Sequence, residues 1–256
     1  MAGKNTYRKP SPKPTPKIAK KASVFSYIKK LLYKVVFYFF IISIGSVALF
    51  KFLPIPFTWT MMDQKVASIM KGEDSEIHYS WRSYNNVSRE MHLAVVAAED
   101  QLFPEHFGFD FKHMQIAYKN NLKGKKVRGA STISQQVAKN VFLWQERSYI
   151  RKALEVYFTF LIEIIWGKQR ILEVYVNVAE MGKNTFGAEA AAQQYFGISA
   201  KNLTREQAAK LAAVLPSPRK WSVTKPGPYV SRRVPKITRQ MRALGGTAYI
   251  KDLRSF

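Results

Sequence analysis

The longest apolar run of the chain lies near its start and predicts a membrane-spanning helix. Residues 31–53 read LLYKVVFYFFIISIGSVALFKFL, without a charge from Val35 to Phe50. The flanking Lys34 and Lys51 can extend their side chains to the lipid headgroups. Roughly 20 apolar residues are needed to cross the hydrocarbon core of a bilayer. We therefore predict a transmembrane helix over residues 31–53.

A cleaved signal peptide is the alternative interpretation of this run. Its apolar core would be shorter, and small residues of the A-x-A type should follow it as a cleavage site. Here the run is followed by Phe50, Lys51, Phe52, Leu53 and Pro54. These flanking residues favour an uncleaved anchor.

The spacing of apolar residues beyond position 54 predicts helices and no strands. Prolines and scattered polar residues over 54–85 predict a linker with a short helix near 60–70. In SREMHLAVVAAED, apolar residues share one face and Ser88 can cap the helix. Five further segments have helical patterns: GASTISQQVAKNVFL, SYIRKALEVYFTFLIEIIWGK, KQRILEVYVNVAEMG, GAEAAAQQYFG and TREQAAKLAAVLPSP. The part of the chain after residue 54 is therefore expected to be mainly α.

The ends of these helices are marked by residues that start or stop a helix. Glycine at positions 167, 182 and 197 and Pro216 are the expected stops. Thr204 and Gln207 form a capping box at the start of the last segment.

Charge gives the expected orientation and the expected kind of partner. Lysine and arginine number 41 against 17 acidic residues, a net charge of +24. Nine basic and no acidic residues precede position 31, so the positive-inside rule predicts a cytoplasmic N-terminus and an exported domain. The Pro- and Lys-rich start predicts a disordered tail. The remaining basic excess favours anionic lipid or a lipid-linked phosphate as partner, and not nucleic acid. The absence of cysteine excludes disulfides and thiolate metal sites.

The segment GASTISQQVAKN has the pattern of a helix with one chemical face. Ile133, Val137 and Val141 form its apolar stripe. Gly129 allows close approach to the helix N-terminus, which favours an anion. The other face presents Thr132, Gln136, Lys139 and Asn140. A solvated face with Ser131 as N-cap is the alternative interpretation.

Two acidic positions are candidates for catalysis. Glu99 and Asp100 end an apolar helix, where desolvation raises the pKa of a carboxyl group and a nearby cation lowers it, so one of them can be tuned as a general base. They could instead cap or salt-bridge the helix end. Glu155 lies four residues after Arg151 among apolar neighbours, either buried with a partner or in an ordinary surface ion pair. The spacing of His106 and His113 matches no strong metal-ligand motif.

Four motifs in this order, EDQLFPEHFGFD, GASTISQQVAKN, RKALE and RILEVYVNVAEMG, closely resemble the glycosyltransferase family that polymerises lipid II into peptidoglycan. The motifs cover roughly residues 95 to 220, and a monofunctional member is expected because the printed chain has no room for a transpeptidase domain after position 256. The resemblance implies a mainly α, lysozyme-like fold with a head lobe, a jaw lobe and a cleft. The implied organisation is a basic cytoplasmic tail over 1–30, a transmembrane helix over 31–53, a linker and jaw entry over 54–85, and a periplasmic glycosyltransferase domain over 86–256.

The resemblance also implies roles for individual residues. Glu99 matches the catalytic base, and Glu155 matches a second essential carboxylate that orients cations and could hold a divalent ion near the pyrophosphate. Lys139 and Arg147 would neutralise the leaving diphosphate. Glu173, Tyr175 and Asn177 look more structural than chemical. The remaining implied substrate-binding residues are Asp100, Phe103, His106, Ser131, Thr132, Gln135, Gln136, Asn140, Arg151 and Lys152.

The implied cofactor is at most a divalent cation, Mg²⁺ or Mn²⁺. The implied partners are lipid II, the growing glycan chain, the bacterial inner membrane and other proteins of cell-wall synthesis. Two alternatives to this function remain open. One is a lytic transglycosylase or hydrolase that cleaves the same glycan, and the other is an anchored scaffold without enzymatic activity.

Overall fold

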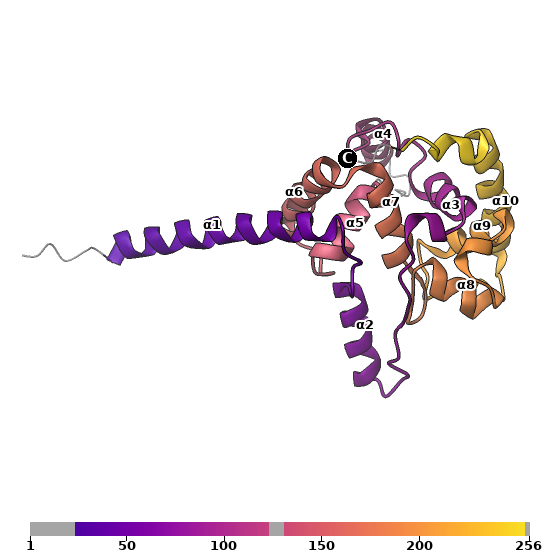
Figure 1. Cartoon of the computed structure of the whole chain (residues 1–256), viewed down its shortest axis with the longest axis horizontal. Coiled ribbons are helices and arrows are strands. Elements are labelled where there is room, and N and C mark those ends of the chain that lie inside the picture. Colours follow the sequence, from indigo (N-terminus) through magenta and orange to yellow (C-terminus); the bar gives the residue numbers. More distant parts are fainter. Residues whose placement is uncertain (1–23, 123–130, 254–256) are drawn as a thin grey trace, which may run out of the picture. The chain divides into compact units, whose positions relative to one another are not determined.

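The computed structural model describes residues 24–122 and 131–253 (Figure 1). The predicted basic tail up to residue 23 and the basic, glycine-containing loop before Ser131 lie outside the described residues. The chain divides into two compact units, 1–43 and 44–256, which are described separately.

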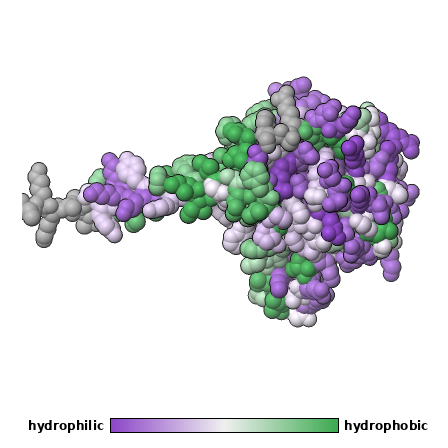
Figure 2. Space-filling view, in the orientation of Figure 1, coloured by the Kyte–Doolittle hydropathy of each residue, from purple (hydrophilic) through white to green (hydrophobic). Residues whose placement is uncertain are grey.

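The first unit is the larger part of helix α1, Val24–Phe50. Its segment Phe25–Phe50 is the one helix, within the described ranges, that is long and apolar enough to cross a membrane. Figure 2 shows hydrophobic side chains along much of this helix. The helix starts before the predicted position 31, because Tyr27 and Ile28 continue the apolar pattern. It also stops before the predicted position 53, because Pro54 disfavours helical conformation in the residue before it.

The second unit is mainly helical, as the sequence predicts. Three short 3₁₀ helices, Tyr84–Asn86, Ala200–Asn202 and Gly246–Ile250, connect its longer elements. The α-helices of its described part are α2 Trp59–Met70, α3 Arg89–Glu99, α4 Phe111–Leu122, α5 Ile133–Phe142, α6 Tyr149–Ile165, α7 Gly167–Val178, α8 Ala188–Phe196, α9 Arg205–Val214 and α10 Pro228–Ala243.

A small sheet contradicts the expectation of no strands. Its strands are β1 His78–Tyr79, β2 Glu180–Gly182 and β3 Thr185–Phe186, in the order β1-β3-β2. Strand β3 pairs parallel with β1 and antiparallel with β2. Helix α7 therefore ends at Val178, and the prediction that it continues to Gly182 is wrong. Strands of two or three residues are too short to show an alternating pattern.

Most of the predicted helix ends are confirmed. The side chain of Ser88 caps α3, and Thr204 forms the predicted capping box with Gln207 at the start of α9. Gly197 ends α8 in the left-handed conformation, with φ of 66°. Ser131 is not the cap of α5, because Thr132 occupies that position and Gln135 completes a capping box with it.

Helix α3 lies in the centre of the hydrophobic core. All residues from Met91 to Ala97 are buried, so this segment is surrounded by the core on every side. It packs against α9, α10 and α7, while α5 packs against α6 and α7. The acidic pair Glu99 and Asp100 thus follows directly after a fully buried helical segment, and this position brings both carboxyl groups to the edge of the core.

Candidate active site

The carboxyl group of Glu99 is held by a hydrogen-bonded chain that starts on α7. The hydroxyl of Tyr175 donates to Oε1 of Gln136 at 3.2 Å, and Nε2 of Gln136 donates to Oε2 of Glu99 at 3.0 Å. Gln136 belongs to α5, so the last residue of α3 is connected to both neighbouring helices. Glu99 itself is half-buried and has no ion pair with another described residue. Its carboxylate is therefore oriented and still able to accept a proton.

The surroundings of Glu99 raise its pKa above the ordinary value. Burial is the largest cause, and the neighbouring charge of Asp100 adds to it. The hydrogen bond from Gln136 and the guanidinium of Arg233 act in the opposite direction. A carboxyl group with a raised pKa is a stronger proton acceptor when ionised, which suits a general base.

Asp100 has a different environment although it is the next residue. Its carboxylate is buried and accepts the backbone N–H of Ile133 at 3.0 Å, at the N-terminus of α5. It also contacts Nε2 of His106 at 2.9 Å. Both oxygens are therefore engaged in fixing α5 and the loop after α3. The alternative interpretation, in which an acid at this position caps a helix end, therefore applies to Asp100, and the helix that it caps is α5.

The apolar side of α5 lies as the sequence predicts, but Thr132, which was expected on the opposite face, is buried. Ile133, Val137 and Val141 are buried in the core. Thr132 and Gln135 are also buried and form the capping box, and the Thr132 hydroxyl donates to the Gly108 carbonyl at 2.6 Å. The opposite side of the helix carries Gln136, Lys139 and Asn140, which are half-buried and line a cavity of about 410 Å³.

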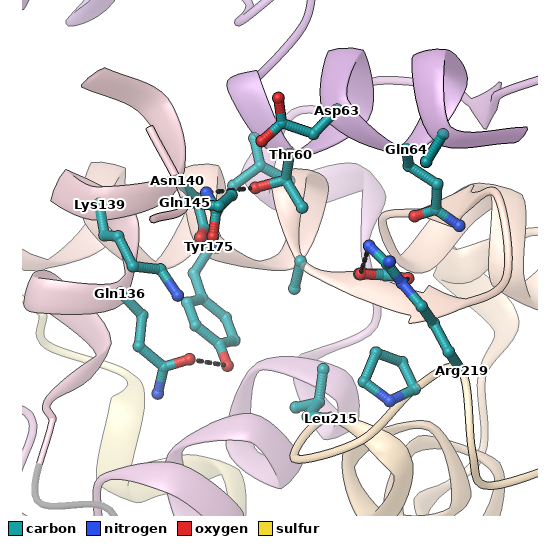
Figure 3. A pocket seen from close by; sticks show the side chains of 15 residues that line it. Thr60, Asp63, Gln64, Gln136, Lys139, Asn140, Gln145, Tyr175, Leu215 and Arg219 are labelled. Carbon is teal, nitrogen blue, oxygen red and sulfur yellow. Dashed lines mark hydrogen bonds and ion pairs between the residues drawn. The ribbon is translucent and has the colours of Figure 1, made fainter. Parts of the chain in front are cut away.

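This cavity lies between α2 and the helices that carry the candidate residues. Its α2 side consists of Thr60, Asp63, Gln64 and Ala67. Figure 3 shows Gln136 and Lys139 extending from α5 on the same side as the Tyr175 ring, with Thr60 and Asp63 across from them. The side chain of Gln145 donates to Thr60 at 2.8 Å and connects α2 to the loop after α5. The farther end carries Arg219, which is paired with Glu180 at 2.6 Å.

Basic side chains gather beside Lys139 around one buried acid. Glu155 is 3% exposed and forms ion pairs with Arg151 at 3.0 Å and with Lys152. Burial lowers the pKa of Lys139, the charge of Glu155 opposes this change, and the cations Arg151, Arg147 and Lys152 reinforce it. Glu155 is therefore not part of an ordinary surface ion pair. Its carboxylate also lies close enough to Lys139 to act on it electrostatically.

Comparison with known proteins identifies the family. The family model described as Transglycosylase matches residues 63–242, well over half of the chain. This chain belongs to the transglycosylase family. The matched range includes the cavity residues on α5 and α7, the acids at 99 and 155, and most of the α2 residues that face them.

Several relatives of this transglycosylase domain carry the name biosynthetic peptidoglycan transglycosylase. The protein from Pseudomonas fluorescens SBW25 is 51% identical over 230 residues, which are 88% of this chain and 96% of that protein. The protein from Pseudomonas aeruginosa PAO1 is 50% identical and covers 87% of this chain and 96% of its own length. The relative from Chromohalobacter salexigens is also 50% identical, with 83% and 91% covered.

The predicted site residues fall into two groups in this domain. The first group lines the cavity or belongs to the charged cluster beside it. Glu99 belongs to this group through its hydrogen bond with Gln136. The other members are Gln136, Lys139, Asn140, Arg147, Arg151, Lys152 and Glu155. The second group is engaged in contacts within the protein that hold the surrounding helices and loops in place. Phe103 is fully buried beneath Lys168 Nζ, which lies 4.5 Å from its ring centroid, and Asp100, His106, Thr132 and Gln135 are engaged in the contacts described above. Ser131 is exposed just before the cap of α5.

Sequence analysis did not assign one residue near Glu99, Arg233, and gave another, Tyr175, only a structural role. Tyr175 looks structural within the apolar run VYVNV, yet its hydroxyl holds Gln136. Arg233 lies on α10 and donates from Nη2 to the carbonyl of Ala98 at 2.8 Å. The other two residues of the fourth motif do have structural contacts: Glu173 pairs with Arg170 at 3.0 Å, and Asn177 pairs with the backbone of Arg82.

The residues present do not fit a divalent cation held by the protein alone. Both oxygens of Glu155 are engaged by basic side chains. Within the described ranges, no three histidine, aspartate or glutamate side chains come together as metal ligands. His106 and His113 are each paired with a separate aspartate, Asp100 and Asp110.

Proposed function

We propose that Glu99 is the general base with which this enzyme joins lipid II units into glycan strands. The enzyme is a peptidoglycan glycosyltransferase, the class named for its relatives and matched by its family. Glu99 would remove the proton from the 4-hydroxyl of the acceptor sugar. The freed oxygen would attack C1 of the donor chain, and the bond from C1 to undecaprenyl diphosphate would break. A single displacement of this kind converts an α-linked donor into a β-1,4 product.

Basic residues account for the departure of the diphosphate. A leaving group of this kind gains negative charge as its bond to carbon breaks, and cations fixed nearby stabilise that charge. Lys139 would be the first of these cations, since it lines the same cavity as Gln136 and lies one helical turn further along α5. Arg147, Arg151 and Lys152 would extend the positive field beside it. Glu155 would keep Arg151 and Lys152 in position.

The observation that supports this proposal most strongly is that α5 connects the carboxylate of Glu99 to the cavity and its cations. Gln136 touches the carboxylate of Glu99 and lines the cavity, and Lys139 lines the same cavity beside the basic group. Helix α5 thus holds the base, which belongs to α3, through Gln136 and itself presents the cation. Inverting transfer needs this arrangement, because the proton acceptor and the leaving group act on opposite sides of one sugar carbon.

A direct assay of the product distinguishes this function from its alternatives. Full-length protein in detergent would be incubated with lipid II, and the products separated by size. Polymeric glycan together with released undecaprenyl diphosphate is the expected result. Shortened muropeptides from added peptidoglycan would instead indicate a lytic enzyme. No turnover of either substrate by a folded preparation would leave the scaffold function as the better interpretation.

The location of the substrate gives the reason for the apolar helix α1. Lipid II is held in the bilayer by its polyprenyl chain, so an enzyme that uses it benefits from a membrane tether. We propose that α1 crosses the bacterial inner membrane once, with the N-terminus in the cytoplasm and the catalytic domain in the periplasm. Exposed apolar residues on α2, namely Trp59, Met62, Val66, Ile69 and Met70, would contact the membrane interface.

Replacing Lys139 by methionine is expected to lower the polymerisation rate about a hundredfold, because one cation near the leaving group is lost. The buried position lowers the pKa of Lys139, so the wild-type rate should decrease with rising pH below the ordinary range of lysine. Lys139→Arg should keep much of the rate and remove this alkaline decrease. The measurement is turnover of fluorescent lipid II across pH, with Lys112→Met on the exposed side of α4 as control. An unchanged rate for Lys139→Met would contradict the assignment.

Arg233 is expected to position Glu99 through the backbone. Its guanidinium binds the carbonyl of Ala98, one of the last carbonyls of α3, and also lowers the pKa of the Glu99 carboxyl. Arg233→Gln removes the cation, so the pKa of Glu99 should rise and the acidic limb of kcat/KM should move to higher pH, with a rate loss of roughly tenfold. Arg232→Gln changes the same charge on an exposed neighbour and should leave the pH profile unaltered. A lower rate with an unshifted profile would indicate a structural role only.

A further inference from the structure

A second cavity, of about 670 Å³, lies between α9 and α10. It shares no lining residue with the cavity that contains Lys139. From α9 it is lined by Arg205, Glu206 and Lys210, and from the α10 side by Pro226, Ser231, Val234, Pro235, Thr238, Arg239 and Arg242. Both helices lie at the right of Figure 1, and this cavity is named the α9–α10 groove below.

The two sides of the α9–α10 groove differ in how their charges are balanced. On α9, Arg205 binds Glu90 with two contacts of 2.8 Å, and Lys210 pairs with Glu206 at 2.9 Å. On α10, Arg239 and Arg242 are exposed, and no acidic side chain of the described residues lies within ion-pair distance of either. Helix α10 contains no acidic residue at all. The α10 side therefore presents two uncompensated guanidinium groups.

These two arginines share one face of α10 with apolar groove residues. Positions 235, 238, 239 and 242 follow the spacing of neighbours on a helix, so Arg239 and Arg242 are about one turn apart. Val234, Pro226 and Pro235 contribute apolar surface to the same groove. A ligand that fits this lining carries carboxylates at intervals, with small apolar groups between them.

Surface composition argues for a protein ligand and against a lipid surface. Among the described residues, α9 has no exposed large hydrophobic side chain, and α10 has only Tyr229. A membrane-binding face needs such side chains to enter the interface, as α2 offers with Trp59 and Met70. In Figure 2 the surface at the α10 edge is mostly hydrophilic. An acidic peptide would be electrostatically complementary to this groove and could bind it without any contact with the membrane.

We propose that the α9–α10 groove binds an acidic segment of a partner protein, whose carboxylates pair with Arg239 and Arg242. Arginine suits this role because its planar guanidinium can form two parallel hydrogen bonds to one carboxylate. The apolar side chains of the segment pack on Val234 and the two prolines. This surface is separate from the reaction site, so binding there recruits the enzyme without occupying its substrate cavity.

A peptide titration with matched variants tests this inference. The probe is a short fluorescein-labelled peptide in which glutamate and leucine alternate, and its binding to the full-length protein in detergent is followed by fluorescence anisotropy. The double variant Arg239→Gln/Arg242→Gln should weaken binding about tenfold or more and leave lipid II polymerisation unchanged. The control is Arg232→Gln/Lys236→Gln, which removes the same charge from exposed positions of α10 outside the groove. Rising salt should weaken binding to the wild-type protein.

Three results would overturn the inference. Equal losses in both double variants would mean that the peptide responds to the general positive charge of α10. Equal affinity for a peptide with glutamine in place of glutamate would remove the role of carboxylates. Binding of the wild-type protein to vesicles of anionic lipid that depends on Arg239 and Arg242, with no binding of the peptide, would assign the groove to the membrane.

Discussion

Glu99→Gln is expected to lower glycan polymerisation about a thousandfold, within the range that a general base contributes to enzymatic rates. Glutamine has nearly the same size as glutamate but cannot accept the proton of the sugar hydroxyl at neutral pH. Its amide oxygen can still accept the hydrogen bond from Gln136, and half-buried surroundings tolerate the neutral group. Folding and lipid II binding should therefore remain, and the loss should appear in kcat.

The pH dependence separates a base from a structural carboxylate. Because burial raises the pKa of Glu99, the wild-type rate should fall with decreasing pH at a value above the ordinary carboxyl range. In Glu99→Gln this acidic limb should disappear from the residual activity. Exposed Glu76 provides a matched control, since Glu76→Gln removes the same charge from an exposed position of the second unit. Retained polymerisation by folded Glu99→Gln protein would refute the assignment of the base.

Most of the helices were predictable because their apolar spacing is a local property of the chain. Ile133, Val137 and Val141 show which side of α5 is buried, and Thr204 with Gln207 shows where α9 begins. Helices α4 and α10 were not predicted, although Val230, Ile237 and Met241 are buried on one side of α10. Its internal Pro235 and high charge obscure the pattern. The small sheet was not predictable, because its strands depend on pairing between residues 78 and 185.

The sequence allowed the candidate residues of the site to be named, but it did not allow their hydrogen-bond partners to be predicted. Local sequence marks Glu99 and Asp100 equally as acids after an apolar helix. Their difference arises from α5, which supplies a side-chain amide to Glu99 and a backbone N–H to Asp100. Arg233 reaches Ala98 from far along the chain, through the packing of α10 on α3. Tertiary packing therefore decides which acid is free to accept a proton.

Burial of the Arg151–Glu155 pair gives the second large effect that we expect. The Glu155 side chain is 4% exposed and that of Arg151 is 11% exposed, so removing one charge leaves the other with little water to solvate it. Glu155→Gln should lower the free energy of unfolding by about 3 kcal/mol, as for other broken buried pairs. It should also lower activity, since Glu155 raises the pKa of Lys139 and holds Arg151 and Lys152.

A double variant separates stability from activity at this position. Arg151→Met in the Glu155→Gln background removes the uncompensated guanidinium, so most of the lost stability should return. Polymerisation should stay low in the double variant, because the cations beside Lys139 remain disorganised. The measurements are urea unfolding followed by circular dichroism and turnover of lipid II.

The pair Glu206–Lys210 on α9 is the matched control for this cycle. It has the same spacing of four residues and an N–O distance of 2.9 Å, but Glu206 is 71% exposed. Glu206→Gln should therefore change stability by less than about 1 kcal/mol. If Glu155→Gln were equally harmless, Glu155 would be an ordinary surface acid. If the double variant recovered activity together with stability, the carboxylate would serve only to balance the charge of Arg151.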